Sequence, residues 1–252
     1  MGGYDVAPRS LNLAWAPTGG IEIPQSAAEA ATQLTNWTVE AWFYAADAAQ
    51  SGALVRKLAG INEAFVLGLD AGVPYVRYQT IQGETIRLDA AAPVTDGAWT
   101  HLAATWDGAA RELLLFVDVD TRYRLALDDD PLYHPEDAPA ASFGAIMIGR
   151  SDNGWSDPTL VDNVRVWNTA RSQLQLKDCA SRIVAQGSDA SLLHDFRFDD
   201  GGPEAEDFAH PFVWNLDYAL VAADYGVGLD AQGHALWLST EALPFAGMDD
   251  VD

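Results

Sequence analysis

Short runs of apolar, aromatic and β-branched residues recur along the chain, and Gly, Pro, Asp and Asn separate them about every eight to twelve residues. Predicted strands of this kind lie at 10–15, 21–24, 37–45, 52–58, 63–70, 73–80, 84–90, 99–106, 112–119, 121–127, 144–150, 160–167 and 192–198. So many short strands with regular turns predict an all-β fold, an antiparallel two-sheet sandwich or jelly roll.

The run at 112–119 is apolar on both faces. Leu113 and Leu115 lie on one side of the predicted strand, and Leu114 and Phe116 lie on the other. This pattern favours a central strand that is covered on both sides.

Helical signals are few. Ser172 followed by Gln175 matches a capping box and predicts one short helix near 172–184. Leu174, Leu176, Cys179 and Ile183 are expected to form its buried stripe. A turn or two of helix is also expected at 27–34.

The chain is strongly acidic, with 37 Asp and Glu against 14 Lys and Arg and a formal net charge of -23. The sequence shows no cluster of Lys or Arg, so we expect no nucleic-acid binding and no affinity for an anionic membrane surface. No apolar run is long enough to cross a bilayer, which predicts no membrane insertion.

The single cysteine and the first residues of the chain bear on the cellular compartment. Cys179 is the only cysteine, which excludes an internal disulfide, and its place on the predicted helix favours a small buried apolar side chain. The first residues show no signal-peptide pattern, and the compartment stays open. We expect an extracellular or particle-associated chain over a cytoplasmic enzyme, and a division into a sandwich at 1–187 and a segment at 188–252 that completes or extends it.

Several of these runs, taken in order, resemble characteristic segments of laminin G-like domains in the pentraxin and concanavalin A-like superfamily. The matching segments are NWTVEAWFYAAD (36–47), ALVRKLAG (53–60), AFVLGLDAGVPYVRY (64–78), DGAWTHLAATWDGAARELLLFVDVD (96–120), and IMIGRSDNG with LVDNVRVWNTARS (146–172). The resemblance covers about residues 10–185. It implies a concanavalin A-like jelly roll, and relatives with this fold usually serve as recognition modules.

One departure from the family pattern concerns a hairpin. Asp118 is followed by Val119 and Asp120 where a glycine is usual, so we expect a tighter or bulged turn there. Asp118 and Asp120 are interpreted as solvated turn residues, and His101 as a structural residue at the edge of the core. No nucleophile–base pair is visible, so we expect no catalysis.

Oxygen-rich loops make calcium a candidate cofactor. Asp128, Asp130, Asp152 and Asp162 are the predicted ligands, because calcium prefers several carboxylate and carbonyl oxygens from converging loops. The alternative is that these loops are merely solvated. Asp162 and Asn163, at the entry of their predicted strand, are then anchors of the adjacent loop.

Two loops carry candidate ligand-binding side chains. Trp155 lies in the polar loop SDNGWSD beside Asn153, and an exposed ring next to polar groups is typical of sugar binding. Tyr133 and His134 form a second candidate pair. The strand tryptophans are expected in the core, and they are Trp37, Trp42, Trp99, Trp106 and Trp167.

Three functional hypotheses follow. The first is a non-catalytic recognition or adhesion module that binds a glycan or a protein partner through its loops or concave face. The second is a structural subunit of a large assembly, such as a phage-like or contractile injection particle or a surface layer. The weakest is a glycoside hydrolase, which needs a pair of suitably placed carboxylates.

Overall fold

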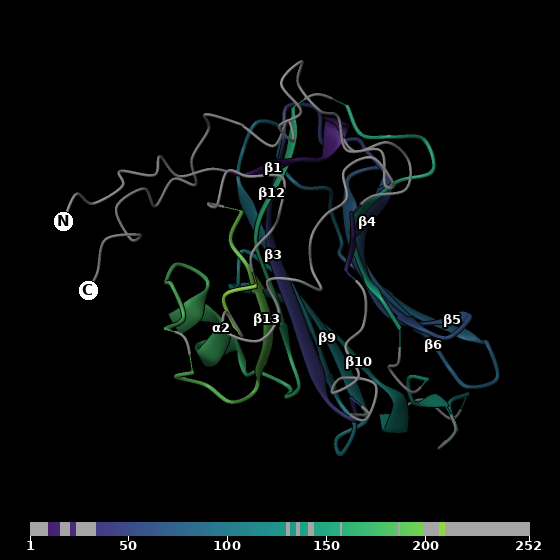
Figure 1. Cartoon of the computed structure of the whole chain (residues 1–252). Helices are drawn as coiled ribbons and strands as arrows, with labels where there is room; N and C mark the ends of the chain where they lie inside the picture. Colours follow the sequence, from purple (N-terminus) through teal and green to yellow (C-terminus); the bar gives the residue numbers. More distant parts are fainter. Residues whose placement is uncertain are drawn as a thin grey trace.

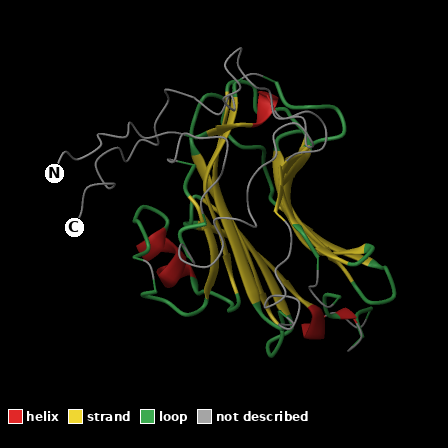
Figure 2. Ribbon diagram, in the orientation of Figure 1, coloured by secondary structure: helices red, strands yellow, loops and turns green. Residues whose placement is uncertain are grey.

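Two antiparallel sheets pack face to face and confirm the predicted jelly-roll sandwich (Figures 1 and 2). The computed structural model describes residues 10–15, 21–23, 34–129, 132–134, 137–140, 144–156, 158–185, 187–198 and 207–209. A short helix lies on the outer face of one sheet.

The first sheet has the order β1-β12-β3-β8-β9-β10, and β13 also pairs with β12. Its strands are β1 (Leu11–Asn12), β3 (Trp37–Ala45), β8 (Thr100–Asp107), β9 (Glu112–Val117), β10 (Thr121–Ala126), β12 (Thr159–Trp167) and β13 (Leu192–Phe196). The second sheet has the order β2-β11-β4-β5-β6-β7. Its strands are β2 (Ile21–Ile23), β4 (Gly52–Ala59), β5 (Asn62–Asp70), β6 (Val73–Gln79), β7 (Thr85–Asp89) and β11 (Ile146–Arg150).

Every predicted run contains a strand, although the run at 10–15 continues as the 3-10 helix η1 (Leu13–Trp15). A second 3-10 helix, η2 (Leu127–Asp129), follows β10. The helix expected at 27–34 lies outside the described residues apart from Leu34. Of the segment 188–252, β13 pairs with β12, while most of the remainder also lies outside the described residues.

Aromatic side chains from both sheets fill the space between them. The ring centroids of Trp37 and Phe65 are 5.0 Å apart, and those of Trp106 and Tyr78 are 5.3 Å apart. Each pair joins a strand of the first sheet to a strand of the second. Trp37, Trp42, Trp106 and Trp167 are buried as predicted, whereas Trp99 is partly exposed, so its prediction as core is wrong.

The helix α2 (Gln173–Cys179) covers the outer face of the first sheet. The Ser172 side chain accepts from the backbone N–H of Gln175, whose side chain accepts from the Ser172 N–H, so the predicted capping box is confirmed. Leu176 packs against Ala103 and Phe116. This layer covers the second face of β9, as its two apolar sides predicted.

For two residues of the predicted helix stripe, the prediction of burial is wrong. Leu174 is 78% exposed and Ile183 is 37% exposed, whereas Leu176 and Cys179 are buried. Leu174 lies about 200° around the helix from Leu176 and therefore faces away from the sheet. Ile183 follows the end of the helix and has no place in its stripe.

The β9–β10 hairpin has a three-residue turn, Asp118–Asp120, between the paired residues Val117 and Thr121. Asp118 and Val119 have positive φ values of 51° and 61°. Val119 is buried against the helix layer, and Gln173 donates a hydrogen bond to its carbonyl at 2.7 Å. The missing glycine thus leaves a strained turn that the helix holds in place.

We predict that Leu176→Ala lowers the free energy of unfolding by about 2–3 kcal/mol, because it leaves a cavity between α2 and β9. Leu174→Ala is the matched control on the same helix and should change that free energy by less than about 0.5 kcal/mol. Urea unfolding measures both values. Equal losses for the two variants would contradict this packing.

Candidate functional site

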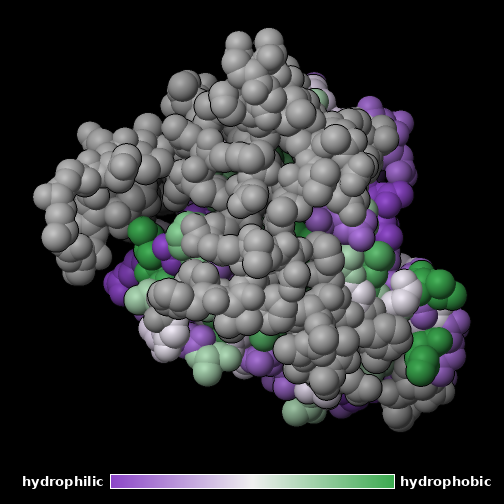
Figure 3. All heavy atoms as spheres, in the orientation of Figure 1, coloured by the Kyte–Doolittle hydropathy of each residue, from purple (hydrophilic) through white to green (hydrophobic). Residues whose placement is uncertain are grey.

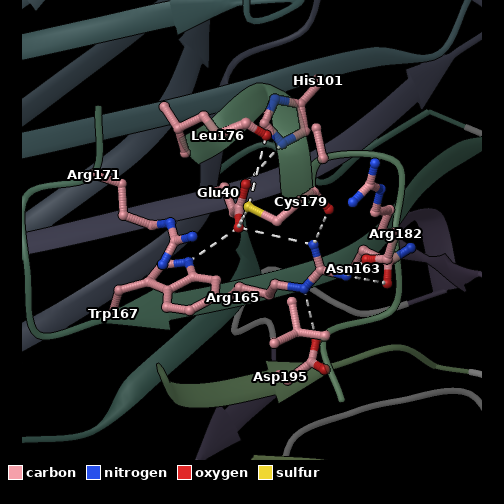
Figure 4. A network of polar contacts seen from close by, with 12 residues as sticks. Glu40, His101, Asn163, Arg165, Trp167, Arg171, Leu176, Cys179, Arg182 and Asp195 are labelled. Carbon is pink, nitrogen blue, oxygen red and sulfur yellow. Dashed lines mark hydrogen bonds and ion pairs between the residues drawn. The ribbon is translucent and has the colours of Figure 1, made fainter. Parts of the chain in front are cut away.

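A buried network of charged side chains lies between the first sheet and the helix layer (Figure 4). Glu40 is fully buried on β3, and its carboxylate accepts from the indole N–H of Trp167 and pairs with His101 Nε2, each at 3.0 Å. Arg165 Nη1 lies 3.8 Å from the same carboxylate.

Arg165 joins this carboxylate to the last described strand. Its Nε lies 2.9 Å from Asp195 on β13, and its other nitrogens donate to the carbonyls of Cys179 at 3.0 Å and Arg182 at 2.9 Å. Arg197 also pairs with Asp195 at 2.7 Å. The network therefore fastens β12, β13 and the end of α2 to one another.

The charges of the network set the ionisation of its members. Burial alone raises the pKa of Glu40, but the hydrogen bond from His101 and the charge of Arg165 outweigh it and hold the pKa below its ordinary value. Burial raises the pKa of the Cys179 thiol to about 12, so this thiol is neutral near pH 7. Glu40, His101 and Arg165 are shielded from solvent, so the network serves packing and not ligand access.

Asp162 and Asn163 form a β-bulge in β12. Asp162 lies opposite Trp42 and Arg165 lies opposite Glu40, so β12 has one more residue here than β3. Asn163 takes up the extra length at φ 47°; its N–H donates to Asp162 Oδ1 at 2.6 Å, and its side-chain oxygen accepts from Arg165. The two polar residues thus aim Arg165 into the network.

The outer face of the second sheet presents a different polar surface. One row across the strands consists of Arg56, Val66, Arg77 and Arg87. The next row consists of Arg150, Ala53, Gly68, Tyr75 and Asp89. Four arginines from four strands therefore gather on one face, which corrects the prediction that no such cluster exists.

These rows line an open cavity of about 320 Å³, which we call the arginine hollow. Its wall on one side is the loop at Ser151–Asn153, and its floor includes Tyr75 and the backbone of Gly52. Figure 3 shows mostly hydrophilic side chains over the upper right of the molecule, where β4 lies in Figure 1.

Tyr75 fills the floor because Gly68 has no side chain. A Cβ on Gly68 would lie 2.8 Å from the Tyr75 hydroxyl. The guanidinium of Arg87 stacks over the Tyr75 ring at 4.2 Å, and that of Arg77 lies 5.5 Å from the ring centroid. Burial is the first cause of the raised pKa of Tyr75, whose hydroxyl is therefore protonated near pH 7.

The loop that borders the hollow is held at several points. Ser151 Oγ lies 2.8 Å from the Ser51 carbonyl and 3.0 Å from that of Gly154. Gly154 has φ 75°, a conformation that glycine adopts without strain. The loop separates the arginine hollow from a second open cavity of about 410 Å³, lined by Gln50, Asn153 and Ser156 among others, and Asn153 borders both.

Trp155 anchors this loop instead of projecting from it. The side chain is only 7% exposed, and its indole N–H donates to the Gly149 carbonyl at 2.6 Å. A Cβ on Gly52 would lie 2.4 Å from the ring, so the absence of that atom makes room for the indole. The prediction that Trp155 is exposed is therefore wrong. The neighbouring residues in the sequence are polar, but the ring itself packs over Gly52 and is buried.

The other predicted ligand-binding residues divide between the two ends of the sandwich. Asn153 is exposed at the rim of both cavities. Tyr133 packs against the core, and the carbonyl of His134 accepts from Arg111. This segment leads to Pro139, which pairs with Thr80 just beyond β6, whereas the arginine hollow lies toward the start of β6. Tyr133 and His134 thus do not join Asn153 in one site.

The predicted calcium ligands are also distributed. Asp128 pairs with Arg111 at 2.6 Å, Asp152 lines the arginine hollow, and Asp162 is buried in the bulge of the other sheet. Asp130 lies outside the described residues. Within the described part of the chain, no group of three or more His, Cys, Asp and Glu side chains is placed to share a metal ion.

Sequence reasoning missed Arg56, Arg77, Arg87 and Arg150 because they lie far apart along the chain. Arg77 and Arg87 alternate with apolar residues in their predicted strands, which was a signal that they face outward. Arg56 is followed by Lys57, and Arg150 ends its run, so the sequence carries a weaker signal for these two. Only the register of five strands shows that these outward positions meet. The described residues include no helix of the length and apolarity needed to cross a membrane.

Fold and surface together define a laminin G-like β-sandwich with a polar cavity on the outer face of its second sheet. The model of the concanavalin A-like lectin/glucanases superfamily matches residues 18–177, which is more than half of the chain, and the chain therefore belongs to this superfamily. A search among curated proteins gives no significant match.

One solved structure supports the fold, and a second is reported as a weaker likeness. A candidate carbohydrate-binding protein from Bacteroides ovatus is 16% identical with a TM-score of 0.58, and the match covers 80% of this chain and 55% of that one. Domains LG4-5 of the mouse laminin alpha1 chain are 12% identical with a TM-score of 0.48, over 69% of this chain and 46% of that one. The chain thus spans about half the length of these two structures.

We predict that Glu40→Gln lowers the free energy of unfolding by about 3 kcal/mol at neutral pH, because it removes the charge that balances Arg165. The pKa of Glu40 is lowered in the folded chain, so its contribution is complete above its ordinary value of 4.5 and is lost as the pH falls through the lower folded pKa.

Urea unfolding between about pH 7 and pH 3 measures this difference, which should shrink below about pH 4.5. Glu84→Gln, at an exposed position in the turn after β6, is the control and should have little effect at any pH. A Glu40→Gln difference that stays constant with pH would contradict the role of the Glu40 charge.

Proposed function

We propose that this chain is a non-catalytic recognition module that binds a glycan in the arginine hollow, against the loop at 151–156. The observation that carries the proposal is the hollow itself, an open cavity of about 320 Å³ in which polar side chains converge over an aromatic floor. Such cavities are the usual form of a small-ligand site.

The side chains of the hollow suit a polyhydroxylated ligand. Each sugar hydroxyl both donates and accepts a hydrogen bond, so a site needs donors and acceptors side by side. Arg56 and Arg150 supply donors, Asp152 supplies acceptors, and the amide of Asn153 supplies both. This mixture supports a carbohydrate more than an apolar ligand.

The rigidity of the rim supports the same conclusion. Ser151 and Trp155 tie the loop to β4 and β11 through the hydrogen bonds and close packing already described. A binding loop that is ordered before its ligand arrives loses less conformational entropy on binding. Trp155 therefore contributes as a support of the loop, and not as a platform on which a sugar stacks.

The positions of the candidate carboxylates support a non-catalytic role. Asp118 accepts from the backbone N–H of His101 at 3.0 Å, and Asp120 pairs with Lys177 at 2.9 Å. Both lie in the β9–β10 turn beside the helix, on the other sheet from the hollow. The role of assembly subunit stays a prediction of the sequence.

We predict that Asn153→Ala weakens glycan binding about 5- to 10-fold, because the loss of one or two hydrogen bonds costs about 1–1.5 kcal/mol. A glycan array of plant, algal and bacterial polysaccharides finds the ligands of the wild-type chain. Titration calorimetry with those ligands then measures the affinity of the variant.

Asn168→Ala is the matched control, because Asn168 is exposed in the turn after β12, on the other sheet. It should bind as the wild-type chain does. An array without any bound glycan, or equal affinity of Asn153→Ala and the wild type, would reject the proposed site.

Calcium remains a proposal for Asp128, Asp130, Asp152 and Asp162, the carboxylates that the sequence predicts as ligands. A calcium ion that binds the native chain stabilises it, so a chelator should lower the midpoint of thermal unfolding, and added calcium should restore it. Magnesium at the same concentration is the control. A midpoint that does not change with the chelator would reject calcium binding.

A further inference from the structure

We propose that the arginine hollow selects an acidic saccharide, and that Arg150 and Arg56 bind the carboxylate of an isolated uronic acid residue. This inference rests on the proposed function and names its ligand class. It begins from the concentration of charge, because four of the chain's 14 Lys and Arg residues line this one cavity of a protein with net charge -23.

The register of the sheet places these positive charges against one another. Arg77 and Arg87 are direct cross-strand partners, and Arg56 lies two strands from Arg77 in the same row. Like charges at directly opposite positions destabilise a sheet unless something compensates them. The compensation differs among the four arginines, and this difference identifies the ones that face a ligand.

Arg77 and Arg87 are occupied by carboxylates of the protein. Arg77 donates to both oxygens of Glu63, at 2.9 and 3.1 Å. Arg87 pairs with Asp89 at 2.6 Å and with Asp70 at 3.0 Å. Both guanidinium groups also lie over the Tyr75 ring, so their role is to build the wall of the hollow.

Arg150 and Arg56 have fewer partners. Among the described residues, no hydrogen bond or ion pair holds the guanidinium of Arg150, which lines the hollow at the end of β11. Arg56 has one longer contact, 3.4 Å from Nε to Glu63, which already binds Arg77. The exposed Asp152 is the remaining carboxylate in the lining that neither Arg77 nor Arg87 binds.

The pKa of Arg56 agrees with its small number of ion-pair partners. Burial lowers its pKa, and the charges of Arg150 and Arg77 lower it further, against the opposing effects of Glu63 and Asp152. A guanidinium nevertheless stays charged at any ordinary pH. A carboxylate that enters the hollow would relieve the repulsion between Arg56 and Arg150 and take donors from both forks.

The net charge of the whole chain favours a ligand that carries a single acid group and not many. A dense polyanion would be repelled by a protein of net charge -23, since its charges extend far beyond the hollow. A single carboxylate interacts mainly with groups within a Debye length, about 8 Å at physiological ionic strength. The hollow therefore fits a saccharide with one uronic acid among neutral residues.

The test uses oligosaccharides that carry one uronic acid each, every one beside its carboxyl-reduced neutral form, and measures affinity by titration calorimetry. The wild-type chain should bind at least one acidic member about 10-fold more tightly than its reduced form. Arg150→Gln should remove most of that preference, because it weakens binding of the acidic form far more than binding of the neutral form. Arg150→Lys keeps the charge but not the fork and should restore only part of the preference.

Arg122→Gln is the matched control, because Arg122 is exposed on β10 of the other sheet and its loss makes the same change in net charge. It should bind as the wild-type chain does. An equal unfolding midpoint for wild type, Arg150→Gln and Arg122→Gln shows that each variant is folded.

The outcomes separate this inference from the proposed function. Equal affinity for the acidic and neutral forms would overturn the inference and leave glycan binding in place, whereas binding to neither form and to no glycan would overturn the proposed function itself. Stronger binding of polygalacturonate or dextran sulfate, reduced equally by Arg150→Gln and Arg122→Gln, would show non-specific attraction and also overturn the inference.

Discussion

The alternation of side chains across each pleated strand constrains the whole molecule. One face of each sheet must bury its side chains against the other sheet, and Trp37, Phe65, Tyr78 and Trp106 meet there. Side chains that can contact a ligand therefore lie on the two outer faces and in the loops. The two sheets use their outer faces in opposite ways.

The first sheet also buries the part of its outer face that lies under the helix layer, so the charged groups there need protein partners in place of water. Glu40 on β3 faces the helix layer, where an uncompensated carboxylate would cost several kcal/mol (about 3–5 on removal of a partner). His101, Trp167 and Arg165 supply its partners, and the bulge at Asn163 sets the direction of Arg165. Asp162 and Asn163 in β12 thus help to place the partner of Glu40, and the helix layer closes this part of the face to ligands.

The second sheet leaves its outer face open and polar. Glycines at two positions shape it, because Gly68 admits Tyr75 and Gly52 admits Trp155. The first contact sets the floor of the arginine hollow and the second fixes the loop at its rim. The absence of two side chains therefore determines where a ligand could be held, and the arginines determine which chemistry it would have.

The sequence by itself determined the strands, the capped helix, the sandwich and the burial of four strand tryptophans, since alternation, turn residues and capping are local properties of the chain. It could not determine the exposure of Trp155 or Leu174, nor the separation of Tyr133 from Asn153. These depend on which surfaces meet after folding. The arginine hollow is the clearest case, because Arg56, Arg77, Arg87 and Arg150 become neighbours only through the hydrogen-bonded register of five strands. Register between distant segments is a property of the tertiary structure alone.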